Sequence, residues 1–118
     1  MASSERDRRI DNIEFAVEDI ARSRAFYGKV FGWSFKDYGP DYCEFSDGRL
    51  TGGLARGGDK PKSGGPLVIL YADDLAETQR RLEEAGAKIV TPLFAFPGGQ
   101  RFHFEDPDGH ELAVWSDK

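Results

Sequence analysis

Few side chains in this sequence are suited to moving a proton or holding a metal ion. His103 and His110 are the only histidines, and Cys43 is the only cysteine. His103 lies in an alternating segment that places it on one face with Arg101 and Glu105, so a general acid or base role requires that face to line the site. His110 adjoins a turn, and we expect it to be exposed. Cys43 has no CxxC partner, so we expect a small buried or half-buried strand residue.

A second group of residues is suited to contacting a flat organic molecule. Tyr42, Tyr71 and Trp115 fall in strand-like segments. Leu67 and Ile69 share the alternation of Tyr71, so these side chains predict a largely apolar surface lined by aromatic rings. The alternative is that the rings only fill space between packed elements. Both interpretations remain open from the sequence.

Composition argues against several other classes of protein. The chain has 118 residues, of which 39% are hydrophobic and 31% are charged, as expected for one compact domain. A net charge of -5 argues against nucleic-acid binding, which needs clustered cations. No segment approaches the roughly 18 apolar residues of a membrane span, and no secretory signal pattern is present. We therefore expect a cytoplasmic protein with no membrane or nucleic-acid partner.

The first half of the chain has the pattern of a strand, a helix and three further strands. Asp19 is the expected N-cap of a helix that ends at Gly32. Alternating residues and the turns at Gly39 and Gly48 predict strands at 10–17, 33–38, 42–45 and 50–55. Segment 57–65, rich in glycine and charge, is the expected flexible linker.

The second half repeats this pattern. Asp74, with Glu77 three residues later, predicts a capping box at the start of a helix that ends at Gly86. Strands are expected at 66–72, 88–92, 100–105 and 111–115. We therefore expect one domain, 1–118, in which module 1 is about 10–56, the linker is 57–65 and module 2 is about 66–116.

An internal duplication relates the two halves. The run Val17–Ser23 (VEDIARS) aligns with Ala72–Thr78 (ADDLAET) at an offset of 55 residues. One module alone is too small to bury both faces of its sheet. The modules should therefore pair, within the chain or by exchange in a dimer, and a curved sheet with helices outside leaves a concave inner face.

Three segments resemble the vicinal oxygen chelate superfamily, which contains glyoxalases, bleomycin-resistance proteins and extradiol dioxygenases. These segments are Asn12–Tyr27 (NIEFAVEDIARSRAFY), Val30–Trp33 (VFGW) and Phe104–Leu112 (FEDPDGHEL). The resemblance implies an α+β fold, in which two tandem βαβββ modules form a curved mixed sheet around a cleft, with the helices outside. It also implies a homodimer. Family substrates include thiohemiacetals, catechols, antibiotics and keto acids, so the fold does not define the reaction.

The resemblance also implies where a metal ion would bind. Metal-dependent relatives take one ligand from the first and one from the last strand of each module, usually His or Glu. The corresponding positions here are Asn12, about Gly53, Leu67 and Glu111. Only Glu111 is a good ligand for the divalent Mn, Fe, Ni or Zn ion that such a site would hold. These ions normally need three or more protein ligands. We therefore predict that the usual metal site is missing, with Glu111 as the one candidate ligand.

Glu14 is the other candidate for chemistry, beside His103. It shares a strand face with Asn12, and a carboxylate that points into a cleft costs several kcal/mol unless it is paired or solvated. Glu14 is either a cation binder or base, or it forms an ion pair with an arginine such as Arg101. Glu111 likewise either contacts substrate or solvent, or is hydrogen-bonded across the cleft.

The candidate ligand-binding residues are therefore Asn12, Glu14, Tyr42, Leu67, Ile69, Tyr71, Glu111 and Trp115. The first hypothesis is a glyoxalase-like protein that binds a small organic molecule in its cleft, without the usual metal site. The alternative is a metal-dependent lyase, isomerase or dioxygenase, with Glu111 as a ligand and Glu14 or Glu44 beside it. A third possibility is a subunit or regulatory domain without a ligand. The sequence does not decide whether the protein is an enzyme.

Overall fold

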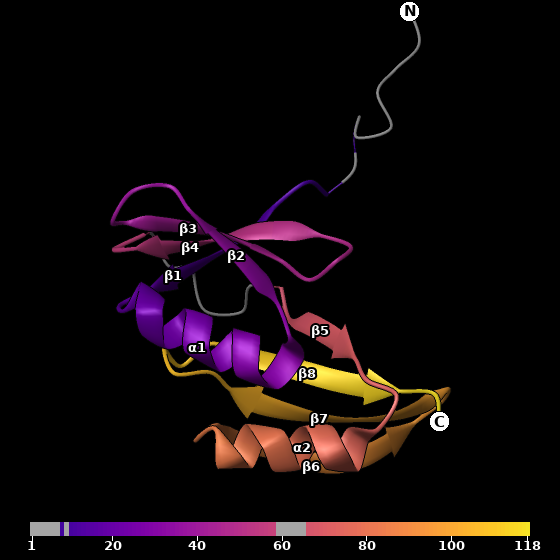
Figure 1. Ribbon diagram of the computed structural model, residues 1–118. Helices are drawn as coiled ribbons and strands as arrows, with labels where there is room; N and C mark the ends of the chain where they lie inside the picture. Colours follow the sequence, from indigo (N-terminus) through magenta and orange to yellow (C-terminus); the bar gives the residue numbers. More distant parts are fainter. Residues whose placement is uncertain (1–7, 9, 59–65) are drawn as a thin grey trace, which may run out of the picture. The chain divides into compact units, whose positions relative to one another are not determined.

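The computed structural model describes residues 8, 10–58 and 66–118 (Figure 1). The chain divides into two compact units, Met1–Lys60 and Pro61–Lys118. Most of the expected linker, 59–65, lies outside the described residues.

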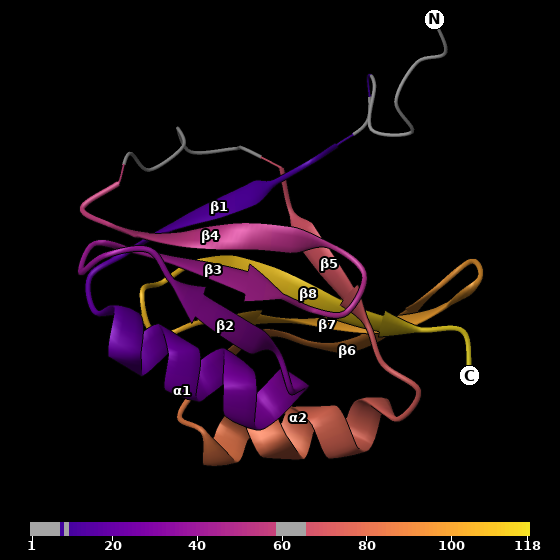
Figure 2. The ribbon, with the colours of Figure 1, turned by 45° about the horizontal axis from the view of Figure 1, so that its top comes forward.

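The first unit is a βαβββ module. Its elements are β1 (Ile13–Val17), α1 (Ile20–Phe31), β2 (Ser34–Asp37), β3 (Tyr42–Ser46) and β4 (Thr51–Arg56). The strands form one sheet in the order β1-β4-β3-β2, in which β1 is parallel to β4 and the other neighbours are antiparallel (Figure 2). The βαβββ topology predicted for the first half is confirmed.

The second unit repeats this topology. Its elements are β5 (Val68–Tyr71), α2 (Leu75–Glu84), β6 (Lys88–Phe96), β7 (Gly99–Glu105) and β8 (Glu111–Ser116). The order is β5-β8-β7-β6, and β5 is parallel to β8. Among the described residues the strands therefore form two four-stranded sheets, one in each unit, and the α+β prediction is confirmed.

Both helices begin at the predicted caps. The Asp19 side chain accepts a hydrogen bond from the Arg22 N–H at 3.1 Å, and Asp74 accepts one from the Glu77 N–H at 3.0 Å. α1 ends at Gly32, whose φ of 72° favours glycine. The Glu77 carboxylate binds Arg80 and Arg81 on the same helix. In the predicted capping box it would instead contact the backbone at the start of the helix.

β6 is longer than predicted. The sequence prediction ended this strand at Pro92, but it continues to Phe96. Its pairing with β7 shifts register between Ile89 and Thr91 and again between Thr91 and Phe94. Pro92 falls inside the second shift, where its missing N–H removes no regular ladder bond, so the strand passes through it.

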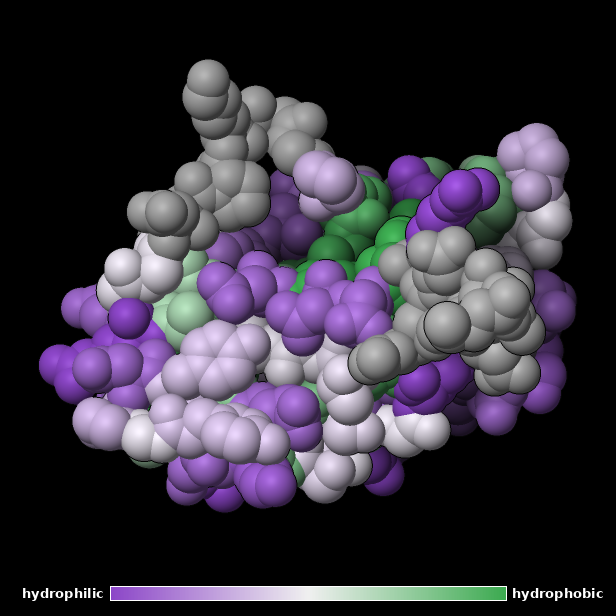
Figure 3. Space-filling view, turned by 90° about the horizontal axis from the view of Figure 1, so that it is seen from above, coloured by the Kyte–Doolittle hydropathy of each residue, from purple (hydrophilic) through white to green (hydrophobic). Residues whose placement is uncertain are grey.

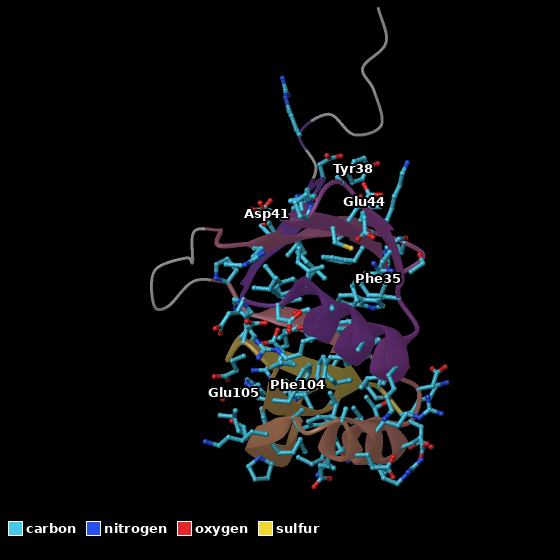
Figure 4. All side chains as sticks on the ribbon, turned by 60° about the vertical axis from the view of Figure 1, so that its left-hand side comes forward. Phe35, Tyr38, Asp41, Glu44, Phe104 and Glu105 are labelled. Atoms are coloured by element: carbon cyan, nitrogen blue, oxygen red, sulfur yellow. The ribbon has the colours of Figure 1, made fainter. Side chains whose placement is uncertain are left out.

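The core of the first unit is a stack of aromatic rings between the sheet and α1. Trp33 lies 4.5 Å from Tyr27 on one side and 4.5 Å from Phe45 on the other, measured between ring centroids. Phe15 of β1 stacks on Tyr27 at 5.9 Å. Phe15 and Phe45 therefore mark the sheet face that α1 covers. Figure 4 shows Phe35 on the α1 side of the sheet and Glu44 on the other side.

The core of the second unit lies between its sheet and α2. α2 packs against β6 and β8. Five side chains in this layer have no exposed surface: Leu82, Phe102, Phe104, Leu112 and Val114. Because neighbouring strand residues point to opposite faces, Phe104 and Glu105, both labelled in Figure 4, belong to opposite faces of the sheet. The residues that alternate with this core form the other face of the second sheet, away from α2, which we call the open face.

The surface combines polar residues with some exposed hydrophobic side chains. In the view of Figure 3 hydrophilic residues cover most of the described surface. None of the described helices combines the length and the hydrophobicity that crossing a bilayer requires. Cys43 has no exposed surface and lies on β3, as predicted.

Candidate functional site

The open face of the second sheet carries most of the predicted site residues. Strand pairing places side chains on this face in rows that run from β5 to β6. One row contains Ile69, Ala113, His103 and Thr91, and the next contains Tyr71, Trp115, Arg101 and Phe94. Continuing the β5–β8 register by one residue places Leu67 opposite Glu111. Leu67, Ile69, Tyr71, Glu111 and Trp115 are therefore brought together.

The aromatic part of this face is accessible. The rings of Tyr71 and Trp115 meet edge to face, with centroids 5.2 Å apart. Tyr71 is 46% exposed and Ile69 is 44% exposed. The Tyr71 hydroxyl donates a hydrogen bond to Asp117 at 2.6 Å, and this bond raises the pKa of the phenol. The bond also orients the ring of Tyr71. Together with Trp115 and Ile69, this ring forms an apolar aromatic surface.

Arg101 supplies a cation beside the aromatic surface. Its guanidinium carbon lies 5.3 Å from the Phe94 ring centroid and 5.7 Å from that of Phe96, within the range of cation–π attraction. Its Nε is buried and has no hydrogen-bond partner among the described residues. A buried donor without a partner costs about 1–3 kcal/mol. Arg101 therefore gains stability from any acceptor that reaches it.

His103 is bound by Glu111 on the neighbouring strand. The distance from His103 Nδ1 to Glu111 Oε2 is 2.7 Å, and 12% of the His103 side chain is exposed. An ionised carboxylate only accepts hydrogen bonds, so Nδ1 carries a proton, and in the neutral form of the ring Nε2 is then an acceptor. Nε2 is buried without a partner among the described residues. The bond between His103 Nδ1 and Glu111 Oε2 therefore leaves His103 Nε2 without a hydrogen-bond partner in the described part of the chain.

The sequence predicted only part of the group that Arg101 and His103 form with their neighbours. It placed His103 on one face with Arg101 and Glu105, and the alternation of β7 agrees. It treated Arg101 only as an ion-pair partner and did not identify Phe94 and Phe96, because their strand was predicted to end at Pro92. The signal available was the two-residue spacing between Arg101 and His103.

His110 differs from the prediction. It is half-buried and not exposed. Its N–H donates to Asp106 Oδ1 at 2.9 Å, and its carbonyl accepts from the Asp106 N–H at 2.9 Å. The turn before β8 is closed by these two bonds, so the backbone of His110 is held against a buried aspartate.

The first unit has its own open face, on the side away from α1. Asn12, Glu14 and Tyr42 belong to it, and strand pairing aligns Glu14 with Gly53, Glu44 and Lys36 in one row. Glu14 is exposed and forms no ion pair within the described part of this unit. An exposed carboxylate is solvated, so the predicted cost of burying it does not arise.

Strand pairing also changes one predicted metal position. Continuing the β1–β4 register by one residue places Asn12 opposite Thr51, just as Leu67 lies opposite Glu111. Thr51 is therefore the equivalent of Glu111 in the repeat, and the assignment to Gly53 is wrong. The count along the sequence does not contain the hydrogen-bonded register of the strands, so it could not identify this position.

The residues at the four positions that correspond to the family's metal ligands, Asn12, Thr51, Leu67 and Glu111, do not form a metal site. The four positions carry an amide, a hydroxyl, an aliphatic chain and one carboxylate, and that carboxylate binds His103. Within residues 8, 10–58 and 66–118 no group of three or more His, Cys, Asp or Glu side chains is placed to hold an ion. A divalent Mn, Fe, Ni or Zn ion normally needs at least three protein ligands, so we derive no chemistry through a metal.

A surface hollow of about 550 Å³ lies beside the start of α1. It includes Asp19 and Arg56. Asp19 already caps α1, and Arg56 lies 3.6 Å from Asp41. Because these charged groups already have partners, the open face of the second sheet is the better candidate site.

Comparison with known proteins agrees with the fold and with the repeat. The family model for the Glyoxalase/Bleomycin resistance protein/Dioxygenase superfamily matches residues 9–114. The chain belongs to this superfamily. A comparison with curated proteins gave no match.

Solved structures show the same fold. A family enzyme from Burkholderia phytofirmans PsJN is 15% identical, with a TM-score of 0.81, over 92% of this chain and 100% of that one. TioX from Micromonospora sp. ML1 is 25% identical, with a TM-score of 0.74, over 92% and 98%. The fosfomycin resistance protein FosX from Mesorhizobium loti is 18% identical, with a TM-score of 0.76, over 92% and 92%.

Proposed function

We propose that this protein binds a planar organic molecule on the open face of its second sheet, without the family's usual metal ion. The observation that carries the proposal is the aromatic pair of exposed Tyr71 and half-buried Trp115 beside Arg101, whose Nε has no partner among the described residues. Aromatic rings bind flat molecules by stacking, and a few polar groups orient the molecule. Ile69 extends the apolar area. The family and one neighbour are named for resistance to small antibiotics, which supports a small molecule as the ligand class.

Tryptophan fluorescence tests this proposal, because the chain has only two tryptophans, one in each unit. The Trp33→Phe variant leaves Trp115 as the reporter, and titration with planar compounds should quench it to saturation. The Trp115→Phe variant leaves Trp33 and should give no saturable change. Tyr38→Ala, which removes a ring that is 53% exposed in the first unit, is the matched control and should bind normally. Equal quenching of Trp33 and Trp115 would contradict the proposed site.

The alternative, a metal-dependent lyase, isomerase or dioxygenase, requires Glu111 to leave His103 and to find at least two further ligands. None of the described side-chain contacts favours it. Metal analysis of protein purified without chelator tests it directly, followed by thermal unfolding with Mn, Fe(II), Ni and Zn. A stoichiometric ion and a rise of several degrees would favour the enzyme, whereas ligand binding that persists with a chelator supports the proposal.

We also propose that the protein is cytoplasmic, forms a homodimer and has no nucleic-acid partner. The negative net charge supports the last statement. The homodimer is supported by the family resemblance and by the open face that each sheet has. Light scattering at several concentrations tests it, and a constant monomer mass would contradict it.

A further inference from the structure

We infer that the molecule bound at this site carries an acidic O–H group, that His103 accepts its proton, and that Arg101 binds the resulting anion. This inference rests on the proposed function, since it identifies the ligand class of the same face. Its basis is the pair of buried nitrogens, His103 Nε2 and Arg101 Nε, that have no hydrogen-bond partner among the described residues.

The two nitrogens have complementary properties. The bond from His103 Nδ1 to Glu111 leaves Nε2 as a basic lone pair. Arg101 Nε carries a hydrogen in every state, because a guanidinium stays protonated in proteins. One site therefore offers an acceptor and a permanently charged donor. A neutral hydrocarbon satisfies neither nitrogen, whereas a molecule with an acidic O–H and a second oxygen satisfies both.

Glu111 makes His103 suited to receive a proton. When the imidazole becomes a cation, the carboxylate at 2.7 Å stabilises it and holds the ring in place. The other charged or titratable groups on this face are Arg101 and Glu105 on the same strand, Lys88 opposite Glu105 on β6, and Tyr71 on β5. Arg101 opposes the imidazolium while the site is empty, and its charge is balanced once the ligand is an anion.

The proton transfer balances without any further reactant. The O–H bond of the ligand breaks, an N–H bond forms at His103 Nε2, and the electron pair stays on the ligand oxygen. The site then holds two cations, imidazolium and guanidinium, with two anions, Glu111 and the ligand. His103 is the proton acceptor, and Glu111 is a positioning residue that acts through it.

The spacing of the two groups limits the size of the ligand. Arg101 and His103 are two residues apart on β7, which corresponds to about 6.6 Å along a strand. A single aromatic ring with oxygens at opposite ends spans such a distance. Phe94 contacts both groups, with its ring 5.3 Å from the Arg101 guanidinium and 6.0 Å from the His103 ring. Phe94 is 36% exposed, and half-exposed side chains change rotamer rapidly, so it can turn to admit a ring.

Two probes that differ by one hydroxyl group test the inference. 4-Nitrophenol has an acidic O–H, and nitrobenzene lacks it. We expect 4-nitrophenol to bind at least about tenfold more tightly, because the nitrobenzene complex leaves His103 Nε2 without a partner. At a pH below the pKa of free 4-nitrophenol, the bound probe should show the yellow phenolate absorption. A bound probe that stays neutral would overturn the proton transfer.

Variants assign the effect to residues. His103→Gln should abolish the phenolate band and reduce the preference for 4-nitrophenol, with unfolding curves showing that the variant folds. Glu111→Gln should retain binding and weaken the phenolate band, whereas a purely structural role would change neither band nor preference. His110→Gln replaces the other histidine and should behave as wild type. Equal affinity for both probes would overturn this inference and leave the planar-ligand proposal standing, and binding of neither probe would overturn both.

Discussion

The phenol ring of Tyr42 lies directly over Gly53 on the neighbouring strand. A Cβ atom added to Gly53 would overlap the hydroxyl and the ring of Tyr42. Gly52 has the same relationship to Phe45 on the opposite face of the sheet. Neither glycine has a positive φ, so the backbone conformation does not require glycine at either position. The pair instead leaves room for two rings of β3, an arrangement in which cross-strand aromatics cover glycines.

This contact predicts that Gly53→Ala destabilises the protein. The added methyl group must displace Tyr42 or separate β3 from β4, and overpacking of this kind costs about 1–3 kcal/mol. Urea unfolding, followed by circular dichroism, measures the free energy of unfolding. The double variant Gly53→Ala with Tyr42→Ala should lose less stability than the sum of the single variants, because the clash is gone. Additive losses would show that the ring is not the cause.

The N-cap of α2 gives a second prediction. Asp74→Ala removes the acceptor for the Glu77 N–H and should lower the free energy of unfolding by about 1 kcal/mol. Asp74→Asn keeps an acceptor oxygen and should restore most of this loss. Asp41→Ala removes an exposed carboxylate that lies in a 3.6 Å ion pair with Arg56, and should cost less than the cap. Thermal unfolding compares the three variants, and equal effects of Ala and Asn at 74 would contradict the cap.

Acid sensitivity in α2 gives a third prediction. Hydrogen bonds from Arg80, then from Arg81, lower the pKa of Glu77 from 4.5 to about 2. A lowered pKa in the folded state stabilises the protein above pH 4.5, and this stabilisation is lost as the pH falls toward 2. The wild type should therefore lose more stability than Glu77→Gln over this range. The difference should shrink in about 1 M salt, which screens exposed charges.

A fourth prediction concerns the buried thiol. Burial, and then a hydrogen bond with Asp37, raises the pKa of Cys43, whose side chain is also fully covered. The thiolate is the reactive form, so Cys43 should not react with a thiol reagent in the native protein. Reaction should appear together with unfolding as urea is added. Rapid labelling under native conditions would show that β3 opens locally.

The sequence predicted the parts of the fold that depend on local signals. Asp19, Gly32 and Asp74 mark helix ends through contacts within a few residues, so their types alone reveal the boundaries. The repeat at an offset of 55 residues then predicted the second module from the first. Alternation also placed Tyr71 and Trp115 on strands, and pairing confirms that they share a face.

The parts that failed depend on which residues lie opposite one another. The equivalence of Thr51 with Glu111 follows from hydrogen-bonded register, which a count along the chain does not contain. The His103–Glu111 bond joins residues of β7 and β8 that are not direct partners in the ladder. The alternation indicated that His103 shares a face with other charged residues, but only the positions of the side chains across β7 and β8 identify Glu111 as its partner.

The parallel neighbours in each sheet affect the order in which the protein folds during synthesis. β1 waits for β4, because Ile13 pairs with Gly52, and β5 waits for β8, because Val68 pairs with Leu112. Neither sheet borrows a strand from the other half of the chain. All four strands of the first sheet are therefore available as soon as Arg56 has left the ribosome, before the strands of the second sheet have emerged from it. In a nascent chain that is halted just beyond this point, the amides that pair β1 with β4 should already be protected from hydrogen exchange. Trp115 has not yet been translated in such a chain.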